Sequence, residues 1–297
     1  MPKNLFTRYI WIIDTIKRYG HITREELNRL WILSPFSNGE PLARRTFYNY
    51  RAAIEDLFKI SIECNPSTFE YYIDEPDNQS QSVTDWMLNS AAMSDVLTDA
   101  REISSRIFLE DVPSARTHLS DIIKAIKASN PVTFTYQPFN RLNAAHGIVL
   151  EPYFLKLFRQ RWYVTGYVSA DNKIKTYALD RMHNVKSLRE QFLMPEDFDS
   201  AEFIRDSFGI VFSQGDVKQV EIKTDSRQAK YFRALPLHHS QREMLHDAYS
   251  IFYYKLKLTP DFVQELLSYG PRISVVSPPE LKAMMVENLT QALNKYK

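Results

Sequence analysis

Apolar residues recur at helical spacing in residues 4–19 and again after Thr23, which predicts two amphipathic helices. Gly20 ends the first helix, because glycine readily adopts the left-handed conformation found just past a helix C-terminus. Thr23 and Glu26 have the spacing of a capping box at the start of the second. The apolar faces of the two helices contain Leu5, Tyr9, Ile12, Ile13, Ile16, Leu27, Leu30 and Trp31.

A third helix is predicted from about Leu42 to Lys59, after a loop rich in Ser, Pro and Gly. At 100° per residue, one arc of this helix is apolar and should face a core, and it holds Phe47, Tyr50, Ile54, Leu57 and Phe58. The opposite arc holds Arg45, Tyr48, Asn49 and Ala52, flanked by Arg44 and Arg51.

That polar arc has the chemistry of a DNA recognition helix. Arginine can bind guanine with two hydrogen bonds, asparagine can bind adenine, and a small alanine allows close approach to the groove. On an isolated helix, a solvated basic face would be the better interpretation. Here two β-like runs, residues 60–63 and 69–73, follow the three helices, which is the element order of a winged helix. We therefore assign residues 1–76 to a winged helix-turn-helix that binds DNA.

Residues 74–80 form an acidic linker, and helical patterning resumes from Val83 to Phe108 and from about Ala115 to Ala128. We assign residues 77–129 to a helical connector. It has no sustained heptad repeat, which argues against a coiled coil.

From Pro131 the apolar period changes to that of strands, and four or five short strands up to residue 195 predict a small β-barrel. Residues 196–297 mix strands and helices and predict a ferredoxin-like α+β module. The fold class is therefore α+β multidomain: winged helix, helical connector, barrel in residues 130–195, and C-terminal module.

Composition narrows the class of protein. The net charge is +1, but residues 131–190 hold nine Lys and Arg against four Asp and Glu, the largest local excess of positive charge. The single Cys64 cannot form an internal disulfide, which fits a reducing compartment. No apolar run is long enough for a signal peptide or a membrane span, so we expect a cytoplasmic protein.

Cations alternate with aromatic residues in this basic region, the pattern that single-stranded nucleic acid requires for its phosphates and bases. For each aromatic residue alone, a place in the barrel core is the better interpretation. We expect Arg161, Lys175 and Arg181 to contact a ligand as a group, and Asp180 to hold Arg181 or a backbone amide. The full set of candidate ligand-binding residues is Tyr136, His146, Lys156, Arg159, Arg161, Tyr163, Lys175 and Arg181.

An enzyme is the rival interpretation. Glu221-Ile222-Lys223 with Asp206 or Asp216 upstream resembles the carboxylate and lysine pattern of metal-dependent nucleases. The pattern arises often by chance, and His238, His239 and His246 are expected to be surface residues and not metal ligands. We expect no catalysis, cofactor or metal. A third possibility is a module that binds protein and not DNA.

The chain resembles the WYL-domain transcription regulators of bacteria. The resemblance rests on Arg161-Trp162-Tyr163-Val164, where Val164 replaces the leucine of the name, and on Ala178-Leu179-Asp180-Arg181-Met182. Tyr136, Pro152 and Lys175, the last where the family usually has arginine, also fit, as does the stretch 270–281.

This resemblance implies an Sm-like WYL barrel and a homodimer that binds a double-stranded operator. It also implies control by single-stranded nucleic acid or a nucleotide bound at the barrel. Some members lie beside phage-defence genes and repress them. The resemblance favours a repressor, with a phage-defence locus as a candidate target.

Overall fold

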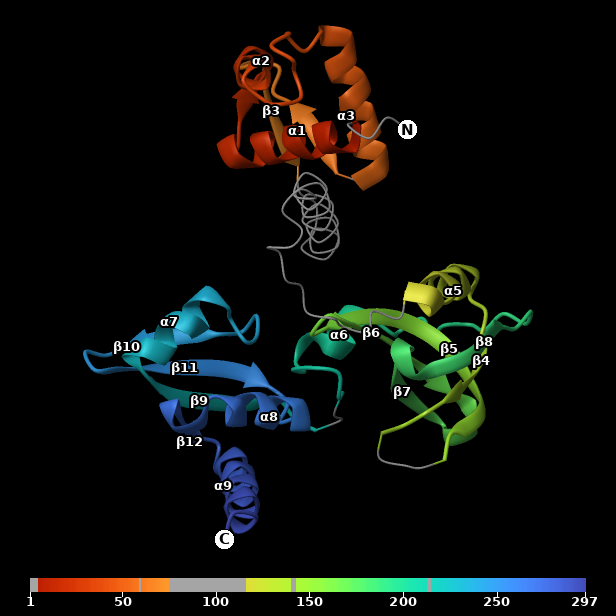
Figure 1. Ribbon diagram of the computed structural model, residues 1–297, viewed down its shortest axis with the longest axis vertical. Helices are drawn as coiled ribbons and strands as arrows, with labels where there is room; N and C mark the ends of the chain where they lie inside the picture. Colours follow the sequence, from red (N-terminus) through yellow and green to blue (C-terminus); the bar gives the residue numbers. More distant parts are fainter. Residues whose placement is uncertain (1–4, 59, 75–115, 140–142, 213–214) are drawn as a thin grey trace. The chain divides into compact units, whose positions relative to one another are not determined.

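The computed structural model describes residues 5–58, 60–74, 116–139, 143–212 and 215–297. The chain divides into two compact units, Met1–Glu110 and Asp111–Lys297, which are described separately (Figure 1). The acidic linker at 74–80, beyond Asp74, and the helix expected from Val83 to Phe108 lie outside the described residues.

The N-terminal unit has three helices and three short strands in its described part. They are α1 (Leu5–Tyr19), β1 (Ile22–Thr23), α2 (Arg24–Ile32), α3 (Arg44–Phe58), β2 (Ser61–Cys64) and β3 (Glu70–Asp74). The strands form an antiparallel sheet in the order β1-β3-β2. The helices and the hairpin that the sequence predicts are therefore present.

Local signals in the sequence define the helix ends of this unit. Gly20 has a φ of 71° directly after α1, the left-handed conformation expected of it. Both hydrogen bonds of the capping box between Thr23 and Glu26 are formed at the start of α2. The core between the helices and the sheet includes Ile12, Ile16 and Leu27, all fully buried.

The helical wheel of α3 predicts burial wrongly for one residue. Phe47, Tyr50, Ile54 and Phe58 are buried as predicted, but Leu57 is 44% exposed. At 100° per residue Leu57 lies at the outermost edge of the apolar arc. At the end of the helix, Ile54 and Phe58 fill the space against the sheet, so Leu57 is left toward solvent.

The second unit begins with one helix and a five-stranded antiparallel sheet, in the order β7-β6-β5-β4-β8. Its elements are α5 (Arg116–Ala128), β4 (Val132–Tyr136), β5 (Ala145–Phe158), β6 (Arg161–Val168), the 3₁₀ turn η2 (Ser169–Asp171), β7 (Lys173–Ala178), the 3₁₀ turn η3 (Leu179–Arg181) and β8 (Met182–Ser187).

Helix α5 is part of this domain's core. Ile122 and Ala125 are buried against Val132, Leu150 and Val164 of the sheet. This helix lies in the segment predicted to be a connector, but its apolar face is covered by the five-stranded sheet. The sheet therefore has an inner face, which packs on α5, and an outer face.

The rest of the unit is a second antiparallel sheet with helices, in the strand order β10-β11-β9-β12. Its elements are α6 (Ser200–Arg205), β9 (Lys218–Asp225), α7 (Ser226–Ala234), β10 (Arg242–Leu245), β11 (Tyr249–Leu256), α8 (Pro260–Ser268), the 3₁₀ turn η4 (Gly270–Arg272), β12 (Ile273–Ser277) and α9 (Pro279–Asn294).

Helices α7 and α8 bury their apolar sides on this sheet, where Phe232 and Phe262 meet Ile222 and Phe252. The elements from β9 to β12 follow the order β-α-β-β-α-β, and neighbouring strands of this sheet are antiparallel. The sequence predicts a mixture of strands and helices here but misses the short helix α6 and the short strand β10. The residues of β10 are all exposed and give no alternating pattern.

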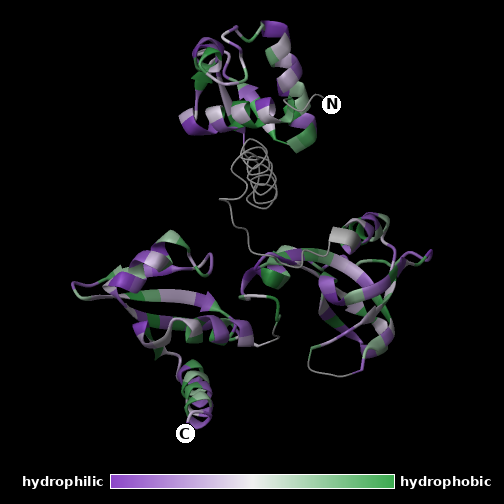
Figure 2. Cartoon of the chain, in the orientation of Figure 1, coloured by the Kyte–Doolittle hydropathy of each residue, from purple (hydrophilic) through white to green (hydrophobic). Residues whose placement is uncertain are grey.

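Helix α9 is buried only at its start, through Leu281. Farther along, Val286, Leu289 and Leu293 are all more than half exposed, and Figure 2 shows hydrophobic residues on this helix. Within the described residues, no helix is long and apolar enough to cross a membrane.

Candidate nucleic-acid interface and effector site

Helix α3 presents an exposed polar surface, which we call the α3 surface: Arg44, Arg45, Tyr48, Asn49 and Ala52. All five side chains are exposed, as the helical wheel predicts. Within the described residues, neither Arg44 nor Arg45 has an ion pair. Both guanidinium groups are therefore available for an anionic partner.

The start of α3 is held in place from α2. The backbone N–H of Leu42 donates a hydrogen bond of 2.7 Å to Asn28 Oδ1. The first turn of α3 then carries two arginines and no acidic residue. Because a helix N-terminus is positively polarised, this placement is unfavourable for the helix alone and favourable for binding a phosphate.

Tyr48 connects the α3 surface to the hairpin. Its hydroxyl is 3.2 Å from the hydroxyl of Tyr71 on β3, and the Arg44 guanidinium lies 5.7 Å from the centre of its ring. The hydrogen bond with Tyr71, followed by Arg44, lowers the pKa of Tyr48, while burial raises the pKa of Tyr71. The exposed ring of Tyr48 is thus fixed in one direction.

Arg51 occupies a different environment from the other candidates on α3. It is half-buried, and its Nε donates to Glu55 Oε1 at 3.0 Å. The same carboxylate oxygen accepts the N–H of Ile62 on β2 at 3.1 Å. Arg51 therefore helps to attach α3 to the hairpin, and its contact with DNA stays a prediction.

In the second unit, the residues of the Trp-Tyr-Leu-like and Leu-Asp-Arg motifs meet in one place. We call this group the arginine cluster: Phe139, Arg161, Tyr163, Asp180 and Arg181. Arg161 Nη2 lies 2.9 Å from Asp180 Oδ2. Burial raises the pKa of Tyr163, and the charges of Arg161 and Arg181 oppose that increase.

The partner of Asp180 differs from the expectation. Asp180 was expected to hold Arg181 or a backbone amide, but it pairs with Arg161 because the turn η3 follows β7 directly beside β6, where Ala178 pairs with Tyr163. Arg181 lies instead with its guanidinium carbon 3.5 Å from the centre of the Phe139 ring. In the sequence, Phe139 is only an isolated aromatic residue, and in the structure its side chain is 74% exposed.

Two atoms of the arginine cluster are buried without a hydrogen-bond partner, Asp180 Oδ1 and Arg181 Nε. Leaving a buried polar group unpaired costs about 1–3 kcal/mol. A bound ligand that accepts from Arg181 would remove part of this cost. The cluster therefore has both the charge and the unsatisfied donor expected of an anion site.

Three other residues predicted to bind ligand contact neighbouring residues of the same domain. Tyr136 is half-buried, its ring packs 4.9 Å from that of Tyr177, and its hydroxyl accepts the N–H of Ala178 at 3.4 Å. Lys175 forms an ion pair with Asp171. His146 is exposed, with Nδ1 at 3.3 Å from the hydroxyl of Thr135.

Lys156 on β5 and Tyr163 on β6 are neighbours in the sheet. They pair directly across β5 and β6, so both project from the same face. Lys156 Nζ donates to the carbonyl of Gly209 at 2.5 Å and lies 5.1 Å from the ring of Phe212. Burial lowers the pKa of Lys156. This lysine therefore attaches residues 209–212 to the sheet, where the sequence analysis expected it to contact ligand.

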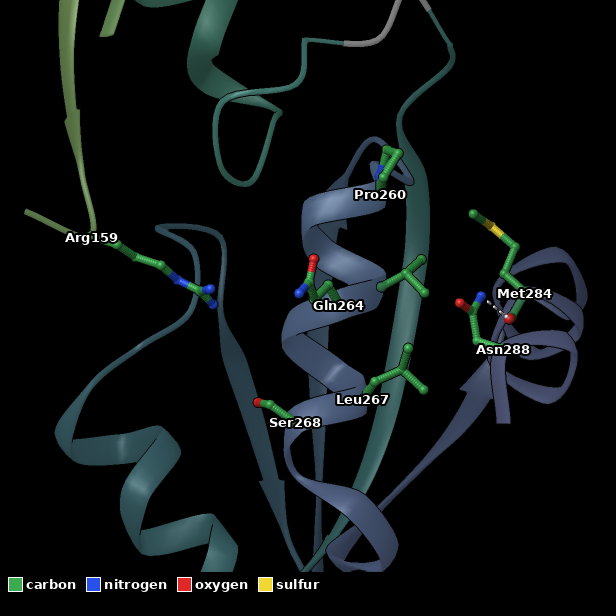
Figure 3. Close-up of a pocket in the computed structure, with 8 residues that line it drawn as sticks. Arg159, Pro260, Gln264, Leu267, Ser268, Met284 and Asn288 are labelled. Atoms are coloured by element: carbon green, nitrogen blue, oxygen red, sulfur yellow. Dashed lines mark hydrogen bonds between the residues drawn. The ribbon is translucent and has the colours of Figure 1, made fainter. Parts of the chain in front are cut away.

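Arg159 stands at the tight turn between β5 and β6, where it and Gln160 both have positive φ, as in a type I′ hairpin. Its guanidinium pairs with Glu265 of α8. Figure 3 shows Arg159 reaching toward α8 at a pocket of about 670 Å³ that Gln264, Ser268 and Asn288 also line. The ion pair, more than a free ligand, explains its position.

The nuclease-like pattern is only partly assembled. Glu221 and Lys223 project from one side of β9, with Ile222 buried between them. Lys223 lies 4.0 Å from the centre of the Tyr249 ring, and the Asp206 carboxylate accepts from Arg205. In the described part of the chain, no group of three His, Cys, Asp or Glu side chains could hold a metal ion.

One of the three histidines differs from the surface location expected. His238 is buried, and its Nε2 donates to the carbonyl of Arg205 at 2.8 Å. This burial lowers its pKa. His238 therefore holds the C-terminal end of α6 against the C-terminal module.

Comparison with known proteins gives two domain matches. Residues 117–187 match the family model of the WYL domain, and residues 216–293 match that of the WCX domain. The chain therefore carries a WYL domain, which contains the arginine cluster, followed by a WCX domain. A search of the curated proteins finds no match.

Two solved structures are similar to the chain. Proteasome accessory factor B/C (PafBC) of Arthrobacter aurescens is 18% identical, with a TM-score of 0.37, and the match covers 98% of this chain and 47% of that one. A crystal structure of a CRISPR Cas-related protein is 10% identical, with a TM-score of 0.41, covering 98% and 85%. The chain thus spans about half the length of the first of these structures.

Proposed function

We propose that the chain is a ligand-responsive transcription regulator. The N-terminal unit acts as a winged helix-turn-helix on a double-stranded operator, with the α3 surface in the major groove. The observation that supports this most directly is the exposure of Arg44, Arg45 and Asn49 on one face of a helix that a hairpin and α2 hold in place. These side chains are the types that read base edges.

The WYL domain is the sensor in this proposal, its curved sheet serving as an Sm-like barrel and the WCX domain as a ferredoxin-like module. The effector is single-stranded nucleic acid or a nucleotide whose phosphate binds at the arginine cluster. The unpaired Nε of Arg181 and the adjacent ring of Phe139 support this, because they offer a donor and a surface for stacking. Phe139 is thereby added to the residues proposed to contact the effector.

A homodimer suits this function, since two α3 helices could then occupy successive major grooves. The exposed residues Val286, Leu289 and Leu293 of α9 support it, because their spacing of three and four residues is that of a helix that packs on another helix. Effector binding would shift the dimer between two geometries. In keeping with the resemblance stated above, we propose a cytoplasmic repressor, with a phage-defence locus as one candidate target.

The test is the binding of the purified chain to duplexes from its own promoter, measured by fluorescence anisotropy at several salt concentrations. We expect the affinity to fall steeply with salt, by about 0.9 in log–log slope for each phosphate neutralised. Indifference to every such duplex would refute the proposal and leave a protein-interaction module. Cleavage of DNA with Mg²⁺ that is lost in Glu221→Gln would establish the nuclease alternative.

A further inference from the structure

A second pocket, separate from the arginine cluster, lies on the outer face of the five-stranded sheet. Glu151, Tyr167 and Ile174 pair directly across β5, β6 and β7 and so share that face. The residues that connect the WYL and WCX domains cover them and enclose a pocket of about 810 Å³. Tyr167 is six residues from Arg161 on β6, roughly 20 Å at the rise of a strand.

The walls of this pocket are aromatic. The ring of Tyr153 on β5 lies 4.8 Å from that of Phe198, and Phe203 lies 5.3 Å from both Phe198 and Phe212. All four rings line the pocket. Because each ring packs against the next, flat apolar surfaces are already in place for a planar ligand.

Glu151 is the acidic residue of the pocket. Within the part of the chain that the structure describes, its carboxylate has no hydrogen bond and no ion pair, although it is half-buried among aromatic rings. Burial raises its pKa, and its proximity contributes to the raised pKa of Tyr153. A partly buried carboxylate without donors is costly, so this site favours a ligand that supplies N–H groups.

Cations stand at the same pocket. Lys173 on β7 and Lys257 after β11 both line it, and neither has an acidic partner among the described residues. Asn172 lies beside them and accepts a hydrogen bond of 2.7 Å from the Tyr167 hydroxyl, which fixes the orientation of that ring. The pocket thus combines aromatic faces, one acceptor and two cations.

We propose that this pocket binds a guanine nucleotide. The base stacks on the aromatic walls, Glu151 accepts the adjacent N1–H and N2–H groups of guanine, and Lys173 and Lys257 contact the phosphate. Adenine and cytosine present a ring acceptor beside their amino group, and uracil presents one donor between two carbonyls, so each would place an acceptor against the carboxylate. This site does not depend on DNA binding by the α3 surface.

The test is isothermal titration calorimetry of the full chain with GMP, and with AMP as the matched competitor. We expect GMP to bind at least about 10-fold more tightly than AMP, and Glu151→Gln to weaken GMP by about 10-fold or more, because the amide presents an N–H where an acceptor is needed. The affinity for GMP should also fall as the pH is lowered, since protonation of Glu151 removes the double acceptor. Equal binding of AMP and GMP, no binding of GMP, or an unchanged Glu151→Gln variant would overturn the proposal.

Two further variants complete the test. Lys173→Ala with Lys257→Ala should weaken GMP by about 10-fold and leave guanosine nearly unchanged, because only the nucleotide carries the phosphate. Glu190→Gln, an exposed residue shortly after β8, and Arg161→Ala, in the arginine cluster, should both leave GMP affinity unchanged. If Arg161→Ala abolishes GMP binding while the lysine variant has no effect, the nucleotide binds at the arginine cluster and the second site does not exist.

Discussion

The two pairs of arginines in this protein are held very differently. Arg44 and Arg45 on α3 are exposed and lack ion pairs within the described residues. Arg161 and Arg181 of the arginine cluster are half-buried, one held by Asp180 and the other stacked on Phe139. In the first pair, Arg44 contacts the exposed ring of Tyr48 on the same helix, whereas the second pair is fixed by contacts with residues of other elements.

Under the proposed function, this difference corresponds to two kinds of ligand. Exposed arginines keep their hydration and can adjust to a duplex whose phosphates all offer the same charge, at a cost in side-chain ordering on binding. Arginines fixed by a carboxylate and an aromatic ring have paid most of that ordering cost during folding. They therefore suit a small effector that must be recognised by position. Under the proposed function, the same residue type would serve two tasks because its surroundings differ.

The largest effect is expected at the exposed residues of the α3 surface. Replacing Arg45 and Asn49 together by alanine should weaken operator binding by about 10- to 100-fold per residue, because each bidentate base contact is worth about 1–3 kcal/mol. The free energy of unfolding should change little, since both side chains are exposed. Fluorescence anisotropy with the promoter duplex measures the first and urea unfolding the second.

The control for this variant is Arg227→Ala, an exposed arginine on α7 of the WCX domain. It removes the same charge from the chain and should leave the affinity within about twofold. Equal losses in the two variants would mean that the α3 surface contributes only general charge and does not read bases.

An intermediate effect is expected at the arginine cluster. Asp180→Ala should lower the free energy of unfolding by about 1–3 kcal/mol, because it leaves the Arg161 guanidinium uncompensated while the two side chains are only 28% and 10% exposed. Urea unfolding measures this loss. Asp171→Ala, which breaks the exposed pair with Lys175, should cost less than about 0.5 kcal/mol. Similar losses at the two sites would remove the distinction between a fixed and a solvated ion pair.

The smallest effect concerns the ring under Arg181. Phe139→Ala should cost about 0.5–1 kcal/mol, the usual contribution of a cation–π contact at an accessible site, because Phe139 itself is 74% exposed and adds little burial. A double-mutant cycle with Arg181→Ala isolates this contact. An interaction energy indistinguishable from zero would show that Arg181 is held by other groups.

Local rules predict the N-terminal unit well. The capping box of Thr23 and Glu26, the left-handed Gly20 and the polar arc of α3 depend on residues within one turn or one helix of each other. Their outcome is therefore contained in the order of the residues. The exception, Leu57, lies at the edge of its arc, where the packing of the neighbouring elements determines exposure and the helical period does not.

The sequence alone thus determined most of the described helices and strands and the exposed face of α3, because hydrophobic periodicity and capping act over a few residues. Only the tertiary structure decided the partners of the WYL-domain residues. Arg161 meets Asp180 through the register of β6 and β7, and Lys156 meets Gly209 across 53 positions of the chain. Such contacts depend on how strands and connecting segments are brought together in space, and no short-range pattern of residue types encodes that arrangement.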